Sequence, residues 1–306
     1  MPNLRPPFRT WVALQWRREQ RMHDDSRTPP ARLGLGCSRL GSVNGVAGSD
    51  ATRLLAAALE EGYRFFDTSN VYGQGDSERL LGNVIGNRSD CLVCTKGGKY
   101  LPFSKRMLVP VKGLIRLAAR RSNAARNGVS SLRSQPLPTR WDIGFISAAI
   151  DGSLRRLRRD AIDVYLLHSP QGSALGDGEA IQALHNAQQA GKIRVVGVSV
   201  DDVGTAVAAL ADPRVGALQL PLHPGAHDYD RVLAQAFRQG VKVIAREILG
   251  GQSAIAAAQD PSAYATARIQ ELHDDPRIAT ILVGTTRISN MKVAARAAGL
   301  TASTPV

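Results

Sequence analysis

Short apolar segments rich in β-forming residues recur along the chain from Leu33 onward. Each is almost continuously apolar, which is the pattern of strands buried on both faces of a parallel sheet. We expect eight such strands, at 33–37, 63–67, 91–95, 162–168, 194–199, 216–220, 241–246 and 279–283. The segments between them carry apolar residues at helical spacing. We expect helices there, at 50–61, 77–86, 143–158, 178–190, 201–210, 230–239, 253–273 and 287–298.

Strands that alternate with helices in this number predict an α/β fold, a (β/α)8 TIM barrel. A doubly wound sheet also alternates the two elements, but it does not need eight repeats. The 306 residues are enough for one barrel, which takes about 250 residues. We therefore expect a single domain over 33–306. Residues 1–32 are expected to form a flexible extension, which five prolines interrupt.

The connection after the third expected strand is much longer than the others. Residues 99–142 form an inserted loop, whereas βα loops usually span about 2–6 residues. It follows the carboxyl end of a strand, which is the active-site face of a TIM barrel. Within it, apolar residues at 111, 114, 115 and 118 have helical spacing, and most basic residues lie off this stripe. We favour the interpretation that this segment packs on the barrel rim as a lid. The alternatives are contact of 105–121 with an anionic membrane surface, and ordering of the segment when a partner binds.

Charge is concentrated in two segments of the chain, whose formal net charge is +13. Residues 1–33 hold seven Arg and three acidic residues, and residues 101–140 hold two Lys and seven Arg with no acidic residue. The rest of the chain therefore has no net charge. A nucleic-acid enzyme would carry a basic stripe across its fold, so no nucleic-acid partner is expected.

Cysteine content and hydropathy indicate the compartment. Three cysteines make no disulfide framework, and no apolar run reaches the roughly 18 residues of a membrane span. We therefore expect a cytoplasmic protein.

Met22 lies shortly before the first expected strand and is an alternative to Met1 as the start of translation.

Four side chains suited to proton transfer follow the ends of three neighbouring strands. Asp67 ends the second expected strand, and Tyr72 lies five residues further on. Lys96 follows the third strand, and His168 ends the fourth. Because the carboxyl ends of parallel strands open at one end of a barrel, we expect an acid, a phenol, an amine and an imidazole to meet there.

The residue types suggest a role for each of the four. A hydride that arrives at a carbonyl carbon leaves negative charge on the oxygen, which Tyr72 would neutralise as a general acid. The ordinary pKa of Tyr is about 10, and a nearby Lys96 ammonium is expected to lower it. Asp67 would keep Lys96 charged and fixed. A neutral His168 would donate a hydrogen bond to the carbonyl oxygen and polarise it.

The segment around Tyr72 resembles a known family. Residues 65–82, FFDTSNVYGQGDSERLLG, closely resemble the signature of the aldo-keto reductases, and Lys96 and His168 fall where that family has its other catalytic residues. IDVYLLH, GKIRVVGVS and VGTT also match, so the resemblance covers about 33–298 except the long loop. It implies an oxidoreductase whose small-molecule substrate is an aldehyde or ketone. The enzyme would reduce this substrate to an alcohol with hydride from NADPH. A non-catalytic nucleotide-binding or regulatory subunit with the same fold is the alternative.

The resemblance also implies a set of cofactor contacts. Ser199 and Gln219 match the positions that hold the nicotinamide carboxamide, and Arg246 matches a side chain that packs on the nicotinamide ring. The loop beneath the ribose corresponds to Gly36, Cys37, Ser38 and Arg39. The pocket for the adenosine phosphate corresponds to Gly284, Thr285, Thr286 and Arg287.

NADP(H) is expected in preference to NAD(H). A helix N-terminus beside the Arg287 guanidinium suits a 2′-phosphate. The chain departs from the family pattern at four positions near the cofactor, namely Val200, Asn290, Val293 and Ala294. These departures lie outside the four proton-transfer residues, so they bear on the cofactor and not on the chemistry.

Three patterns that imitate functional motifs are interpreted as structural. GLGCSRLG at 34–41 lacks the spacing of a dinucleotide-binding glycine loop. Cys91 and Cys94 form a C-x-x-C pair inside a buried strand, which indicates core packing. His223 and His227 could join His168 and Asp67 as the metal ligands of a hydrolase barrel. Their spacing is loose, and no metal is expected.

Overall fold

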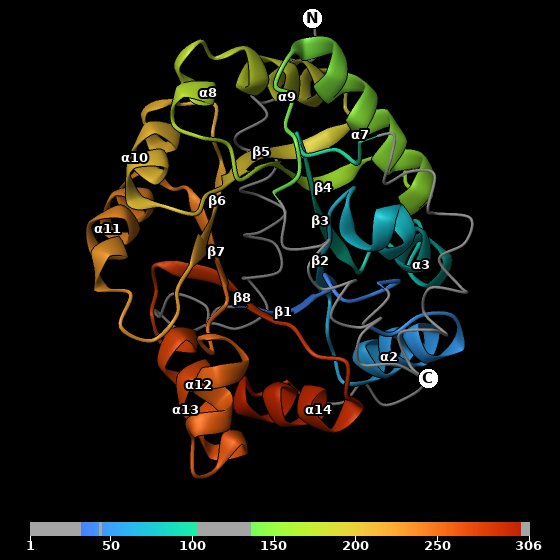
Figure 1. Ribbon diagram of the computed structural model, residues 1–306, viewed down its shortest axis with the longest axis vertical. Helices are drawn as coiled ribbons and strands as arrows, with labels where there is room; N and C mark the ends of the chain where they lie inside the picture. Colours follow the sequence, from blue (N-terminus) through green and yellow to red (C-terminus); the bar gives the residue numbers. More distant parts are fainter. Residues whose placement is uncertain (1–31, 43–44, 103–135, 301–306) are drawn as a thin grey trace, which may run out of the picture.

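The computed structural model describes residues 32–42, 45–102 and 136–300. Within these ranges, eight parallel strands close into a barrel in sequence order, and helices surround them (Figure 1). The prediction of a TIM barrel in the α/β class is confirmed. Figure 1 shows α10 and α11 on the opposite side of the barrel from α2 and α3.

The strands lie within a few residues of their predicted positions. They are β1 (Arg32–Gly36), β2 (Phe65–Asp67), β3 (Leu92–Gly97), β4 (Ile162–His168), β5 (Ile193–Ser199), β6 (Ala217–Pro221), β7 (Lys242–Arg246) and β8 (Ile278–Val283). The ring closes where β1 pairs with β8, with Leu35 opposite Val283. This closure brings the loops that follow the first and last strands side by side.

Helices follow every strand in the described ranges. They are α2 (Ser49–Glu60), α3 (Asp76–Val84), α7 (Ile143–Leu157), α8 (Ser173–Gly176), α9 (Glu179–Gln189), α10 (Val203–Ala211), α11 (Asp230–Gln239), α12 (Gly251–Ala257), α13 (Pro261–His273) and α14 (Ile288–Ala297). The 3-10 helices η1 (Tyr72–Gly75) and η2 (His227–Tyr229) follow β2 and β6. Helices α7, α10 and α13 begin at aspartate N-caps whose carboxylates accept first-turn N–H groups.

The helix predicted over 253–273 is two helices, so that prediction was wrong. Helix α12 ends at Ala257, and α13 begins at Pro261. A proline inside a helix has no N–H to donate and clashes with the carbonyl four residues earlier, so it favours the first turn. The Asp260 carboxylate completes the new start by accepting hydrogen bonds from the backbone N–H of Ser262 at 2.8 Å and of Ala263 at 3.1 Å.

The apolar core has two layers because strand side chains alternate between the two faces of the sheet. A small cluster fills the barrel interior, and a larger one packs the helices onto the outside of the sheet. Cys94 belongs to the interior cluster and Cys91 to the outer one, so the C-x-x-C pair faces two different layers. This arrangement agrees with the interpretation of both cysteines as packing residues.

The long insertion leaves and rejoins the barrel at one place. Lys99 and Thr139 form an antiparallel bridge, and the backbone N–H of Arg140 donates to the Gly98 carbonyl at 2.8 Å. The two ends of the insertion therefore meet just beyond the end of β3. The amphipathic stripe at 111–118 and residues 1–31 of the expected extension at 1–32 lie outside the described residues, and the predictions for them stay predictions. Arg32, the last residue of that expected extension, is the first residue of β1.

The helices of the described part of the chain include none that is both long and apolar enough to cross a membrane.

Candidate active site

The four predicted proton-transfer side chains lie together at the carboxyl end of the barrel. Asp67 is the last residue of β2, and Lys96 is the last but one of β3. His168 ends β4, and Tyr72 opens η1 in the loop after β2. Three neighbouring strands thus supply the group, as the sequence led us to expect.

Lys96 and Asp67 form a buried ion pair. The Lys96 Nζ donates to both carboxylate oxygens of Asp67 at 2.7 Å and to the Thr68 carbonyl at 2.9 Å. The Lys96 side chain is 1% exposed. Burial alone would lower the pKa of Lys96, but the charge of Asp67 and its hydrogen bonds raise that pKa above its ordinary value. The ammonium therefore stays charged although it is out of water.

Tyr72 lies against this ion pair and is partly exposed. Its ring centroid is 5.2 Å from the Lys96 Nζ, and the His168 ring stands edge-on with the two centroids 5.7 Å apart. Burial raises the pKa of the Tyr72 phenol, and the Lys96 charge, which lowers it, offsets only part of this rise. The expected lowering by Lys96 is present, but desolvation of the phenol outweighs it, so the pKa of Tyr72 is raised overall. The phenol consequently holds its proton at neutral pH.

His168 is the neutral imidazole that the sequence predicts. Burial lowers its pKa well below the ordinary value, and the charges of Lys96, Lys99 and Arg246 lower it further. The Ser69 hydroxyl oxygen lies 2.9 Å from Nδ1 of the ring. When that hydroxyl donates to Nδ1, the ring proton resides on Nε2, which can then donate to a carbonyl oxygen. Sequence reasoning missed Ser69, although it lies within the 65–82 segment, because a loop residue carries no periodic signal for its direction.

A small hydrogen-bonded group fixes the turn that presents Tyr72. The Ser77 hydroxyl donates to the Cys37 carbonyl at 2.9 Å and lies 2.7 Å from the Thr68 hydroxyl. Gly73 has φ of 55°, and a Cβ there would lie 2.7 Å from the Leu40 carbonyl oxygen. The turn thus needs a glycine beside Tyr72, and it is held against the end of β1. Sequence reasoning did not assign these roles to Ser77 or Thr68.

The pair expected to hold a carboxamide is joined to the proton-transfer group. The Ser199 hydroxyl donates to the Gln219 Oε1 at 2.9 Å, and the Gln219 Nε2 donates to the Asp67 Oδ1 at 2.8 Å. All three side chains are buried. Gln219, in the middle of β6, therefore links that strand to the ion pair, a contact that the sequence did not indicate.

Arg246, expected against the nicotinamide ring, stands at the end of β7. It forms ion pairs with Asp201 and Glu247 and donates to the Val200 carbonyl at 2.8 Å. Its Nε is buried and has no hydrogen-bond partner among the described residues. An arginine held in this way at the mouth, with one donor unused, fits an additional polar ligand beside it.

The two loops expected beneath the ribose and around the adenosine phosphate lie next to each other. A Cβ built on Gly36 would lie 3.6 Å from the Gly284 Cα. Ser38, Arg39 and Arg287 are exposed.

The start of α14 fits a bound phosphate. Its N-cap, Arg287, offers no side-chain acceptor to the first-turn N–H groups in the described structure. Unsatisfied N–H groups at a helix start, beside a guanidinium, suit an anion. The residues present thus fit a dinucleotide with a phosphate at this end, and the individual contacts to NADP(H) stay predictions.

A metal centre finds no support in the described ranges. They contain no group of three or more His, Cys, Asp or Glu side chains that could hold a metal ion. His223 and His227 are exposed after β6.

Comparison with known proteins places this geometry in a family. The model of the Aldo/keto reductase family matches residues 32–296, and the chain therefore belongs to that family. The 6-dehydroglucose reductase of Novosphingobium aromaticivorans is 31% identical over 196 residues, which cover 57% of this chain and 53% of that protein. Aldo-keto reductase yakc of Schizosaccharomyces pombe, whose name carries NADP(+), is 29% identical over 208 residues, covering 67% of this chain and 52% of that protein.

Solved structures agree with the fold. The aldo-keto reductase from Bacillus halodurans in its holo form superposes with a TM-score of 0.64 at 21% identity, covering 90% of this chain and 89% of that one. The chain spans about half the length of the curated relatives it matches, with shares of 53% and 52% for the two above.

Proposed function

We propose that the protein is an NADPH-dependent carbonyl reductase, which converts an aldehyde or ketone to an alcohol. The observation that carries the proposal is the buried Asp67–Lys96 ion pair behind a partly exposed Tyr72, with a neutral His168 at the edge of its ring. This set can supply one proton to an oxygen at the mouth and stabilise the charge left behind. If these were ordinary surface residues, the Lys96 side chain would be exposed to solvent, whereas it is only 1% exposed.

Each residue acts on the substrate oxygen or on the proton donor. The His168 Nε2–H donates a hydrogen bond to the carbonyl oxygen and polarises the C=O bond. NADPH, when bound, supplies the hydride for the carbonyl carbon. As negative charge develops on the oxygen, Tyr72 transfers its phenol proton to it, and the alcohol forms. Lys96, anchored by Asp67, stabilises the phenolate that remains on Tyr72 until a proton returns from solvent.

The preference for NADPH over NADH is part of the proposal. Arg287 and the uncapped start of α14 would bind the 2′-phosphate that only NADPH carries. Ser199 and Gln219 would hold the carboxamide next to the ion pair, and Arg246 would lie beside the ring. The name of yakc, which carries NADP(+), supports the same preference.

A carbonyl screen tests the proposal directly. Purified protein is mixed with NADPH and a panel of aldehydes, ketones and sugar-type carbonyls, and loss of NADPH absorbance is followed. Sugar carbonyls belong in the panel because one relative is named a 6-dehydroglucose reductase. We expect turnover with at least one member. Tight NADPH binding without turnover across the panel would instead favour a regulatory nucleotide-binding subunit.

A further inference from the structure

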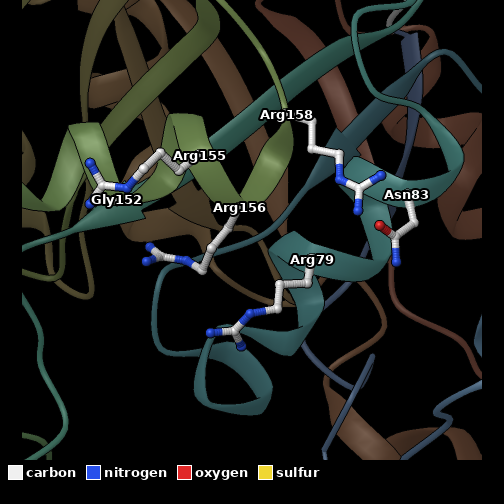
Figure 2. A pocket seen from close by; sticks show the side chains of 6 residues that line it. All are labelled: Arg79, Asn83, Gly152, Arg155, Arg156 and Arg158. Atoms are coloured by element: carbon white, nitrogen blue, oxygen red, sulfur yellow. The ribbon is translucent and has the colours of Figure 1, made fainter.

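A cavity rich in arginine lies between two helices on the outside of the barrel, and none of the mouth residues described above lines it. Its volume is about 470 Å³, and it lies between α3 and α7 (Figure 2). Its lining consists of Arg79 and Asn83 from α3 and of Gly152, Arg155, Arg156 and Arg158 at the end of α7. None of these lining residues is acidic.

Two of the four guanidinium groups have acidic partners. The Arg156 Nε donates to the Glu78 Oε2 at 2.6 Å, and the Arg79 Nη1 lies 2.9 Å from the Asp76 Oδ1. Arg155 and Arg158 are exposed, and neither forms an ion pair with an acidic residue of the described ranges. The cavity therefore carries about two positive charges in excess of its acidic neighbours.

This excess is unusual for the molecule. Outside residues 1–33 and 101–140, acidic and basic residues balance. The carboxyl end of α7 favours basic residues through the helix dipole, but that effect fades within the last turn. It does not explain why Arg79 and Asn83 face the same cavity from another helix (Figure 2). Like charges gathered in one concavity repel one another, and an anion removes that repulsion.

We propose that this cavity binds the dianionic phosphate group of a small phosphorylated molecule. Arginine forks match phosphate oxygens in pairs and bind them more strongly than neutral donors do. A cavity of this volume suits a small organic ligand, since such pockets span about 300–1,000 Å³. The Asn83 amide offers a donor and an acceptor for the organic part of the ligand.

The site favours a small molecule over a nucleic acid. A nucleic-acid surface would continue as a basic stripe, whereas the described body around this cavity is neutral overall. The excess of about two charges corresponds to one phosphate monoester. The proposal does not depend on the reductase function, because it concerns a separate surface and its test measures binding alone.

The variant that tests the site removes only the two unpaired arginines. Arg156 is left intact because its loss would strip the fully buried Glu78 of its ion-pair partner. The double variant Arg155→Gln/Arg158→Gln is titrated calorimetrically, as the full chain, with glycerol phosphate and with inorganic pyrophosphate at low salt. We expect affinity for both probes to fall by at least about tenfold, since hydrogen bonds between charged groups are the strong ones.

Three matched variants locate the effect. Arg231→Gln/Arg238→Gln removes the same charge from exposed positions of α11 on the opposite side of the barrel and should leave binding within about twofold (Figure 1). In an Arg287→Ala background, which removes the phosphate contact proposed at the mouth, the glutamine double variant should show the same loss of affinity. Arg155→Lys/Arg158→Lys keeps the charge but loses the fork, and an intermediate affinity is expected.

Several results would overturn the proposal. They are the absence of millimolar binding by the wild-type protein, unchanged affinity in the glutamine double variant, and an equal loss in the α11 pair. A second arm uses vesicles that contain phosphatidic acid. If only vesicle binding falls in the double variant, while the soluble phosphates bind as before, the site recognises a lipid surface and the small-molecule assignment is wrong.

Discussion

The two sides of the barrel mouth differ in how completely they are built. At the ends of β2, β3 and β4, the polar groups of Asp67, Lys96 and His168 are buried and bonded to one another or to their immediate neighbours. At the ends of β1 and β8, the loops carry the exposed side chains of Arg39 and Arg287. Gln219 belongs to the first side through its hydrogen bond to Asp67.

This difference separates chemistry from affinity. Groups fixed before the ligand arrives need no reorganisation during the reaction, which is the main source of electrostatic stabilisation in enzymes. Exposed loops instead carry many of the side chains that determine which ligand is bound. We therefore expect changes on the buried side to alter rate and stability, and changes on the exposed side to alter cofactor binding.

The largest effect is expected from Tyr72→Phe. It removes the proton donor but keeps the ring that packs against His168. Loss of a general acid costs about 10²–10⁴ in rate, so kcat should fall by that factor while the Kd for NADPH stays nearly unchanged. Steady-state kinetics on the best substrate of the carbonyl screen, with fluorescence titration of NADPH, measures both. A kcat near that of the wild-type protein would show that another group donates the proton.

The second prediction concerns stability. Asp67→Asn leaves the Lys96 ammonium buried without its counter-charge, and breaking such a pair costs about 3–5 kcal/mol of unfolding free energy. The control is Asp50→Asn, which breaks the exposed pair between Asp50 and Arg53 on α2 and should cost less than about 1 kcal/mol. Urea-induced unfolding at pH 7 measures both variants. Equal small losses would contradict the view that the ion pair is a tightly built element.

The exposed side is tested by Arg287→Ala. We expect the Kd for NADPH to rise by about 10- to 100-fold and the Kd for NADH to change little, since hydrogen bonds to charged groups contribute about 1.5–3 kcal/mol. Fluorescence titration with each cofactor gives the ratio. The Kd of Arg287→Lys for NADPH should lie between those of the wild-type protein and of Arg287→Ala. Equal weakening of both cofactors would indicate a structural arginine and would remove the proposed contact with the 2′-phosphate.

The smallest expected effect is on the pH dependence. The pKa of His168 is lowered, so the neutral imidazole persists below about pH 6.5, and the pKa of Tyr72 is raised, so the protonated phenol persists above about pH 10. Both groups keep their working forms between these limits. We expect kcat/KM for carbonyl reduction to be flat over that window. A clear inflection within it, retained in Arg287→Ala, would mean that one of the two assignments is wrong.

The sequence predicted the barrel well because its signals are local. Every strand is a short apolar run of its own, and the strands observed agree with the predicted runs within a few residues. The error at 253–273 came from following apolar spacing across Pro261, where the proline and the Asp260 cap begin a new helix. Backbone chemistry there was stronger evidence than the hydrophobic pattern.

For the barrel mouth, the sequence indicated which strand ends meet. It did not indicate how burial and charge together set the pKa values there. It predicted the meeting of Asp67, Lys96 and His168 because strand ends in a parallel barrel share one face. It did not predict the raised pKa of Tyr72, because desolvation depends on all the atoms around the phenol. The bond from Gln219 to Asp67 joins residues 152 positions apart, a distance over which periodicity carries no information.

The paired ends of the long insertion have a consequence for how such barrels diversify. The bridge between Lys99 and Thr139 closes the segment at its neck, the place next to β3 where its two ends meet. The entropy of closing a loop grows only with the logarithm of its length, and each doubling costs about 0.6 kcal/mol. Insertions and deletions beyond the neck are therefore nearly neutral for folding. Natural selection can exchange this segment as a cassette while Lys96 stays in place.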